Sequence, residues 1–302
     1  MSCKQSQPDW IDRQLHKELF DINLSESIET YATSENPSQI ENTIKNLEQA
    51  KGYFDKVFEE KLNFAVLFVD NKNWNKYAFI PPPGMPQAHY EGNMILGLGK
   101  SMMATRAEQG LQNIPESELS NLKKYYGEEV DLDLFFRDGL SLHELGHLYQ
   151  FYKTGKNSQR RWLDEIFGNL CQVGAARNME SQEVFNRMDS YQMLLVQQNR
   201  WGELKYKTLV QFEEDYLDVM KQGQNYGWYQ TQFYLMAKEL HSKYGDEFLN
   251  IFRDFLIDTN PTIIGKLSNE GLQELMIENL GQDAVEILQW KYETLNDNDL
   301  EN

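Results

Sequence analysis

The chain has few cysteines and no long hydrophobic run. Cys3 and Cys171 are the only two cysteines among 302 residues and lie far apart in the sequence. That count excludes a disulfide framework and a cysteine-rich zinc site. The longest apolar runs, such as residues 64–69, are far too short to span a bilayer. We therefore expect no transmembrane segment.

Positive charge is also scarce. The sequence holds 29 lysines and arginines against 47 aspartates and glutamates, a formal net charge of -18. The densest basic stretch lies in residues 153–161, and its length favours a solvated loop over a binding patch. A protein of this charge repels phosphate backbones, so we expect no nucleic-acid partner.

The start of the chain gives two predictions of localisation. It lacks a hydrophobic signal segment, so the sequence as written predicts a cytoplasmic protein. Cys3, however, is followed by a polar stretch over residues 4–8. This pattern resembles the mature start of a bacterial lipoprotein whose signal peptide has been replaced by a methionine. An envelope lipoprotein anchored through Cys3 is therefore the alternative.

The composition is that of a soluble globular protein, with 40% apolar and 13% aromatic residues. No internal repeat and no Pro-, Gly- or Ser-rich linker separates independent domains. We divide the chain into a polar N-terminal segment (1–37), a helix plus small sheet ending in a histidine-bearing helix (38–152), and a helical subdomain (153–302). The three parts are expected to form one catalytic unit.

Hydrophobic periodicity predicts an α+β fold with a small mixed sheet in the first half, an active-site helix at the centre and a mainly helical second half. The predicted strands are 62–70, 77–80 and 94–98, with a proline-rich extended loop over 81–86. The predicted helices are 38–60, 132–152, 162–179, 184–198, 209–221, 229–243, 246–256 and 272–293.

The most informative pattern is His143-Glu144-Leu145-Gly146-His147. Residues four apart lie above one another on a helix, so the two imidazoles can share one cation. Glu144 follows the first histidine and can take a proton from a water molecule activated by the metal. The pattern is typical of a zinc-dependent hydrolase, with Glu144 as its general base.

A catalytic zinc ion needs a third protein ligand. The next predicted helix offers two adjacent carboxylates, Asp164 and Glu165. Helical phase does not choose between them, because they flank its apolar stripe on opposite sides.

Together, His143–His147 and the following Trp162-Leu163-Asp164-Glu165 resemble the gluzincins, the thermolysin-like and aminopeptidase-like zinc peptidases. The resemblance covers residues 141–174 and, more loosely, 226–245. It implies a zincin-like fold and zinc held by His143, His147 and Glu165. It also implies that Asn169, four positions after Glu165, supports a ligand histidine; a helix-surface amide is the other interpretation.

The resemblance extends to two further segments. Residues 225–233 look like the tyrosine-bearing segment of these peptidases, which implies that Tyr226, or else Tyr229, assists the oxyanion. Residues 84–89 match by position the strand that pairs with substrate backbone, although a surface loop explains them equally well. The chain departs from the family in lacking the Gly-Ala-Met-Glu-Asn segment, so aminopeptidase specificity is not implied.

The remaining candidate residues carry no metal-ligand spacing. His16, His89 and His241 are expected to be ordinary surface, core or helix histidines, and Cys171 a small buried residue. We therefore predict a zinc-dependent metallopeptidase that acts on a peptide or protein substrate. The alternatives are a catalytically silent metal-binding scaffold and a zinc hydrolase with a non-peptide substrate.

Overall fold

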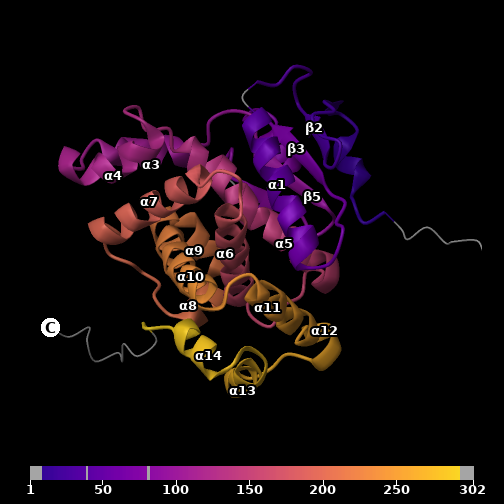
Figure 1. Ribbon diagram of the computed structural model, residues 1–302, viewed down its shortest axis with the longest axis vertical. Coiled ribbons are helices and arrows are strands. Elements are labelled where there is room, and N and C mark those ends of the chain that lie inside the picture. The colour runs from indigo at the N-terminus through magenta and orange to yellow at the C-terminus, as the bar shows by residue number, and fades with distance from the viewer. Residues whose placement is uncertain (1–8, 39, 80–81, 293–302) are drawn as a thin grey trace, which may run out of the picture.

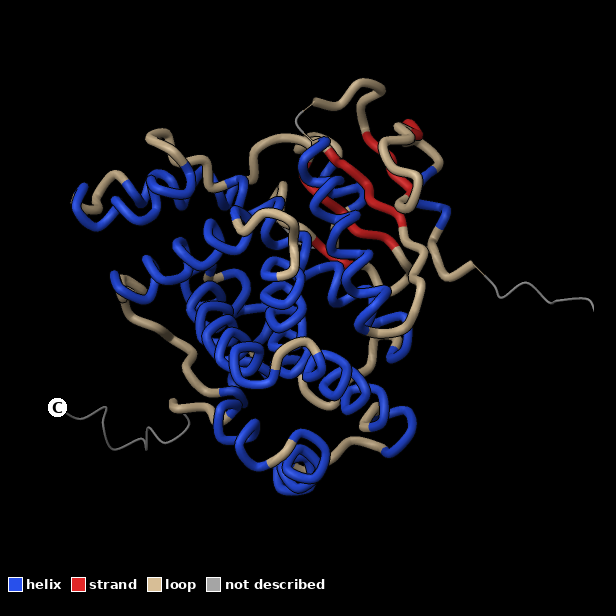
Figure 2. The backbone as a smooth tube through the Cα atoms, in the orientation of Figure 1, coloured by secondary structure: helices blue, strands red, loops and turns tan. Residues whose placement is uncertain are grey.

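The computed structural model describes residues 9–38, 40–79 and 82–292 (Figure 1). In these residues a small sheet lies in the first half of the chain, and the second half is helical (Figure 2). This confirms the α+β prediction. Cys3, on which the lipoprotein alternative depends, lies outside the described residues.

Five strands of the described part form one mixed sheet in the order β1-β2-β3-β5-β4. The pairs β2–β3 and β3–β5 are parallel, whereas β1 and β4 are antiparallel strands at the two edges. The strands are β1 (Phe20–Asp21), β2 (Glu29–Ala32), β3 (Ala65–Val69), β4 (Gln87–Ala88) and β5 (Asn93–Gly97).

The predicted strand 77–80 is wrong for its described residues. Trp74–Tyr77 form the short helix α2, and residue 80 lies outside the described part. Trp74 and Tyr77 are both buried in the hydrophobic cluster on one face of the sheet. A spacing of three residues brings both rings to that face only in a helix, whereas strand alternation would separate them.

Both faces of the sheet are covered, and every residue of β3 is buried. Val66 and Phe68 belong to the main core, which they share with helix α1 (Glu41–Val57). Leu67 lies in the second cluster with Trp74. Figure 1 shows α1 running in front of β3 and β5. An entirely apolar strand is expected for a sheet that is covered on both sides.

The histidine-bearing helix is not the single element predicted over 132–152. It consists of a π-helical turn, η2 (Leu134–Gly139), followed by α5 (Leu140–Thr154). Arg137 lies within this turn and forms ion pairs of 3.1 Å with both Asp133 and Asp138. All three side chains are buried, so each charge requires the partners that it has. This buried network fixes the entry into α5.

The other helices of the described part largely follow the predicted pattern, but several differ from it. Helix α10 begins at Gly223, before the predicted start, and the predicted helix 209–221 consists of two helices, Leu209–Glu214 and Tyr216–Lys221. The segment 272–293 is broken at Gly281, whose φ of +89° ends a helix. Residues 102–126 form two unpredicted helices, and two short helices, Arg13–His16 and Pro261–Ile264, were not predicted either. The elements are η1 (Arg13–His16), α3 (Met102–Leu111), α4 (Glu116–Tyr126), α6 (Arg161–Arg177), α7 (Glu183–Gln198), α8 (Leu209–Glu214), α9 (Tyr216–Lys221), α10 (Gly223–Tyr244), α11 (Glu247–Asp258), α12 (Pro261–Ile264), α13 (Asn269–Leu280) and α14 (Gln282–Leu288). Among the described residues, no helix combines the length and apolar character needed to cross a bilayer.

Helices α5 and α6 approach each other very closely. A Cβ atom added to Gly146 would lie 2.5 Å from Cβ of Cys171 and 2.9 Å from its Sγ. Cys171 is fully buried, as predicted. The glycine on α5 and the small thiol on α6 therefore permit a helix contact that larger side chains would prevent.

His89 is buried at the end of β4 without a hydrogen-bond partner for its Nε2 among the described residues. Its ring stacks on Phe79 with 3.7 Å between the ring centroids. Burial lowers the pKa of His89 to about 4, against a smaller opposing effect of Asp12. The folded protein therefore holds His89 in its neutral form.

This burial predicts a pH-dependent stability. Between pH 6.5 and 4 the unfolded chain binds a proton at His89 that the folded chain excludes. The contribution of neutral His89 to the free energy of unfolding should thus be fully present above pH 6.5. As the pH drops to 4, the free energy of unfolding should fall by up to about 3 kcal/mol. We expect urea denaturation of His89→Gln to show a shallower decline over this range. An identical decline in both proteins would contradict the assignment.

Candidate metal centre

His143 and His147 project from consecutive turns of α5 toward one point. Their Nε2 atoms are 2.9 Å apart, and the ring planes are nearly perpendicular at 79°. Both side chains are buried. Two buried imidazole nitrogens at this separation can be ligands of a single cation.

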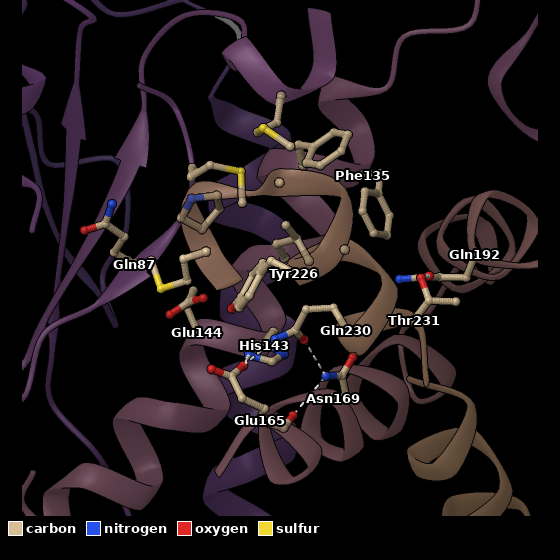
Figure 3. Close-up of a pocket in the computed structure, with 18 of the residues that line it drawn as sticks. Gln87, Phe135, His143, Glu144, Glu165, Asn169, Gln192, Tyr226, Gln230 and Thr231 are labelled. Carbon is tan, nitrogen blue, oxygen red and sulfur yellow. Dashed lines mark hydrogen bonds and ion pairs between the residues drawn. The ribbon is translucent and has the colours of Figure 1, made fainter. Parts of the chain in front are cut away.

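Glu165 reaches the same point from the second turn of α6. Its Oε2 lies 3.4 Å from Nε2 of His143, and the ligand atoms of Glu165, His143 and His147 all lie within 4.8 Å of one another. Figure 3 shows the carboxylate of Glu165 beside the ring of His143. Of the two carboxylates that the sequence left open, Glu165 therefore faces the histidines.

The donor set suits a divalent cation. Two neutral imidazoles and one carboxylate are common ligands of catalytic zinc, and their burial requires partners of opposite character. Burial alone would raise the pKa of Glu165, but the adjacent His143 and His147 hold it at about 2. The carboxylate is consequently ionised and available to a metal. These three residues of the described part could bind one metal ion.

Asp164 has a different role. It accepts a hydrogen bond of 2.5 Å from Nε2 of Gln150, and Oε1 of Gln150 lies 3.2 Å from Nδ1 of His147. The chain Asp164–Gln150–His147 fixes the orientation of the second imidazole. Such outer contacts align metal ligands and set their tautomer.

The carboxylate of Glu165 is held by two side chains that sequence reasoning missed. Tyr216 donates its hydroxyl to Oε1 at 3.2 Å, and Gln230 donates Nε2 to Oε2 at 2.8 Å. Their sequence signal is weak, because only Gln230 follows a predicted site residue, Tyr226, at helical spacing.

Asn169 supports this arrangement but not in the way the resemblance implies. Its amide donates to Oε1 of Gln230 at 3.1 Å and to the backbone carbonyl of Glu165 at 2.9 Å. Neither of these bonds reaches a ligand histidine. Asn169 instead holds Gln230 in place, as Figure 3 shows. It is also buried, so the helix-surface interpretation is wrong.

Glu144 lies next to β4. The backbone N–H of Ala88 donates to its Oε2 at 2.7 Å, and burial raises the pKa of Glu144 to about 7. Residues 84–89 are therefore not simply a surface loop. They include the edge strand Gln87–Ala88, which lines the cavity at the site.

The structure separates the two candidate tyrosines. Tyr226 lines the cavity with the histidines, and burial followed by the charge of Glu165 raises its pKa well above the usual range. Tyr229 is fully buried and donates its hydroxyl to the carbonyl of Thr208 at 2.7 Å. Tyr226 is thus placed at the site, and Tyr229 has a packing role.

His16 and His241, which were not predicted to bind a metal, contact other polar side chains. Nε2 of His16 is 2.8 Å from Oδ1 of Asn93. His241 lies between Arg177 and Asp246, at 3.0 Å and 2.9 Å respectively. Neither histidine belongs to the group of possible metal ligands found among the described residues.

The candidate metal centre opens into a cavity of about 1060 Å³. Its walls include the three possible ligands, Glu144 and Tyr226. This volume is at the upper end of the range for small-molecule sites and can hold several residues of a peptide. Comparisons of the chain with protein-family models, with curated proteins and with solved structures gave no match.

The ring of His143 packs directly against Gly168, so adding one methyl group at position 168 should disturb the candidate metal centre. A Cβ added to Gly168 would lie 2.6 Å from Cε1 and Nε2 of His143. We expect Gly168→Ala to displace the ring and to weaken zinc binding on the order of 10- to 100-fold, as measured by competition with a chelating indicator. The matched control is Gly139→Ala, whose added atom would meet its nearest neighbour at 3.7 Å. Unchanged zinc affinity in Gly168→Ala would refute the placement of His143.

Proposed function

We propose that the protein is a zinc-dependent metallopeptidase of gluzincin type with a zincin-like fold. The observation that carries the proposal is the convergence of His143, His147 and Glu165 beside Glu144 in the wall of one cavity. In the proposal, the first three bind zinc, and Glu144 acts as general base.

A zinc ion held there would polarise the scissile carbonyl and make a water molecule more acidic. Glu144 is suited to accept that proton, because burial raises its pKa to about 7, near the operating pH. It then returns the proton to the departing amine. The hydroxyl of Tyr226, which faces the same cavity, donates a hydrogen bond to the developing oxyanion.

A peptide or protein substrate is supported by the edge position of β4. Gln87–Ala88 pair with β5 on one side only, and they line the cavity. An edge strand can pair with an extended chain through its outward backbone groups. The outward N–H of Ala88 donates to Glu144 in the free protein, so a substrate would have to replace Glu144 as its partner. In this proposal the substrate backbone runs along β4, and its scissile bond lies opposite Glu144.

The two alternatives are supported less well. A silent metal-binding scaffold requires only the three ligands, yet a carboxylate with a raised pKa, Glu144, lies beside them in the cavity. A zinc hydrolase with a non-peptide substrate would use the same centre, but it would not need an edge strand along the cavity.

The role of Glu144 is tested by Glu144→Gln. The amide keeps the shape of the side chain but cannot accept the proton, so we expect normal zinc content and a loss of cleavage of at least about 100-fold. A peptide-library digestion should show cleavage by the zinc-loaded wild type, loss after chelation and recovery on adding zinc. Cleavage at the wild-type rate by zinc-loaded Glu144→Gln would contradict the assigned role.

The role of Tyr226 is tested by Tyr226→Phe. Loss of an oxyanion donor should lower kcat by about 100- to 1000-fold while leaving KM and zinc content nearly unchanged. The matched control is Tyr229→Phe, which removes a hydroxyl bound to the Thr208 carbonyl outside the cavity wall. The control should lower the unfolding free energy rather than kcat. Equal kcat values for Tyr226→Phe and wild type would exclude Tyr226 as a donor.

A further inference from the structure

The cavity continues beyond the metal centre along helix α10. Gly223, Gly227 and Thr231 recur every four residues on one face of α10, and all three line the cavity. A Cβ atom added to Gly227 would meet its nearest neighbour, a ring carbon of Trp201, at 3.6 Å. A methyl group at Gly227 would therefore just contact Trp201, and a larger side chain there would extend into the cavity that Gly227 lines.

The wall around this space is aromatic. Phe135 and Phe136 of η2 contact Tyr191 of α7, with ring centroids 4.8 and 5.9 Å apart. In the view of Figure 3, Tyr226 lies between Glu144 on one side and Phe135 on the other. We call this part of the cavity the aromatic arm; it is lined by Phe135, Phe136, Tyr191, Gln192, Gly227 and Thr231.

The aromatic arm contains an amide nitrogen, Nε2 of Gln192, that has no partner among the described residues. Gln192 is only 5% exposed, and its Oε1 accepts a hydrogen bond of 2.9 Å from the hydroxyl of Thr231. This bond is the only one that the described residues give to the Gln192 side chain. Figure 3 shows the amide nitrogen of Gln192 directed away from Thr231. Nε2 of Gln192 does not belong to the fully buried unpaired atoms of the described part, so it reaches the cavity that Gln192 lines. Water or a ligand in the cavity can accept its hydrogen bond.

We propose that the aromatic arm binds a tyrosine side chain of the substrate, with Nε2 of Gln192 donating a hydrogen bond to the phenol oxygen. The rings of Phe135, Phe136 and Tyr191 favour an aromatic side chain, because aromatic pairs stabilise more than their buried area alone. The donor at Gln192 favours a ring with an oxygen over phenylalanine. Assigning this ligand to a substrate residue rests on the proposed peptidase function, whereas the binding preference itself does not.

The test measures binding without catalysis. Zinc-loaded Glu144→Gln is titrated calorimetrically with N-acetyl-Gly-Tyr-Gly-amide and with the corresponding phenylalanine peptide. We expect the tyrosine peptide to bind about threefold to tenfold more tightly, the effect of one neutral hydrogen bond in a buried site. Equal affinities, or no binding of either peptide, would overturn the proposal.

Two further substitutions in the same background locate the effect. Gln192→Met keeps the size of the side chain but removes the donor, so it should abolish the preference for tyrosine and leave the phenylalanine peptide unaffected. Gly227→Leu fills the aromatic arm and should weaken both peptides at least tenfold. Gly52→Leu is the matched control for a helical glycine, because Gly52 is exposed on α1 outside the cavity lining. Full-strength binding by Gly227→Leu would place the peptides elsewhere and overturn the proposal.

Folding and function are separated by independent readouts. Zinc content and melting temperature show whether each variant is folded with an intact metal centre. If Glu144→Gln binds the tyrosine peptide preferentially but the wild type cleaves no peptide, the proposed peptidase fails and the aromatic arm stands. If the wild type cleaves peptides but the binding preference is absent, the aromatic arm fails and the peptidase stands.

Discussion

The close approach of α5 to α6 is the constraint on which the site depends. Gly146 of α5 faces Cys171, and Gly168 of α6 faces the ring of His143, at distances that exclude a Cβ atom on either glycine. Each helix thus supplies a glycine against which a side chain of the other helix packs. Because protein interiors are close-packed, this contact between the two helices fixes the distance of Glu165 from the imidazoles. Helix α6 then packs on α10, which brings Gln230 to the same carboxylate.

Two glutamates in one cavity are held in different electrostatic states. Burial alone would raise the pKa of Glu165, but the hydrogen bond and charge of His143, the charge of His147 and the hydrogen bond from Gln230 lower it to about 2. Glu144 receives one backbone hydrogen bond, and burial raises its pKa to about 7. The same type of side chain is thus ionised in one position and has a pKa near neutrality in the other. The hydrogen bond with His143, which Glu165 has and Glu144 lacks, accounts for most of this difference.

The sequence was informative where a local pattern decides the geometry. Helical spacing alone places His143 and His147 on one face. Short stretches rich in Phe and Val indicated a small sheet, and helical periodicity indicated the helices that follow it. Tertiary contacts decided the rest. Trp74 and Tyr77 form a helical turn because both rings enter one cluster, and η2 is a π-turn where Arg137 pairs with two buried aspartates.

Helix α10 runs from the candidate metal centre along the rest of the cavity. Gln230 holds Glu165, and the next residue, Thr231, holds Gln192 in the aromatic arm. Tyr226 lies one turn before Gln230 on the same helix. These positions lie within two turns of one helix, so their relative placement is set by the geometry of α10. The aromatic arm and the candidate metal centre thus share α10 as one wall, and η2, which carries Phe135 and Phe136, leads directly into α5 on the other side.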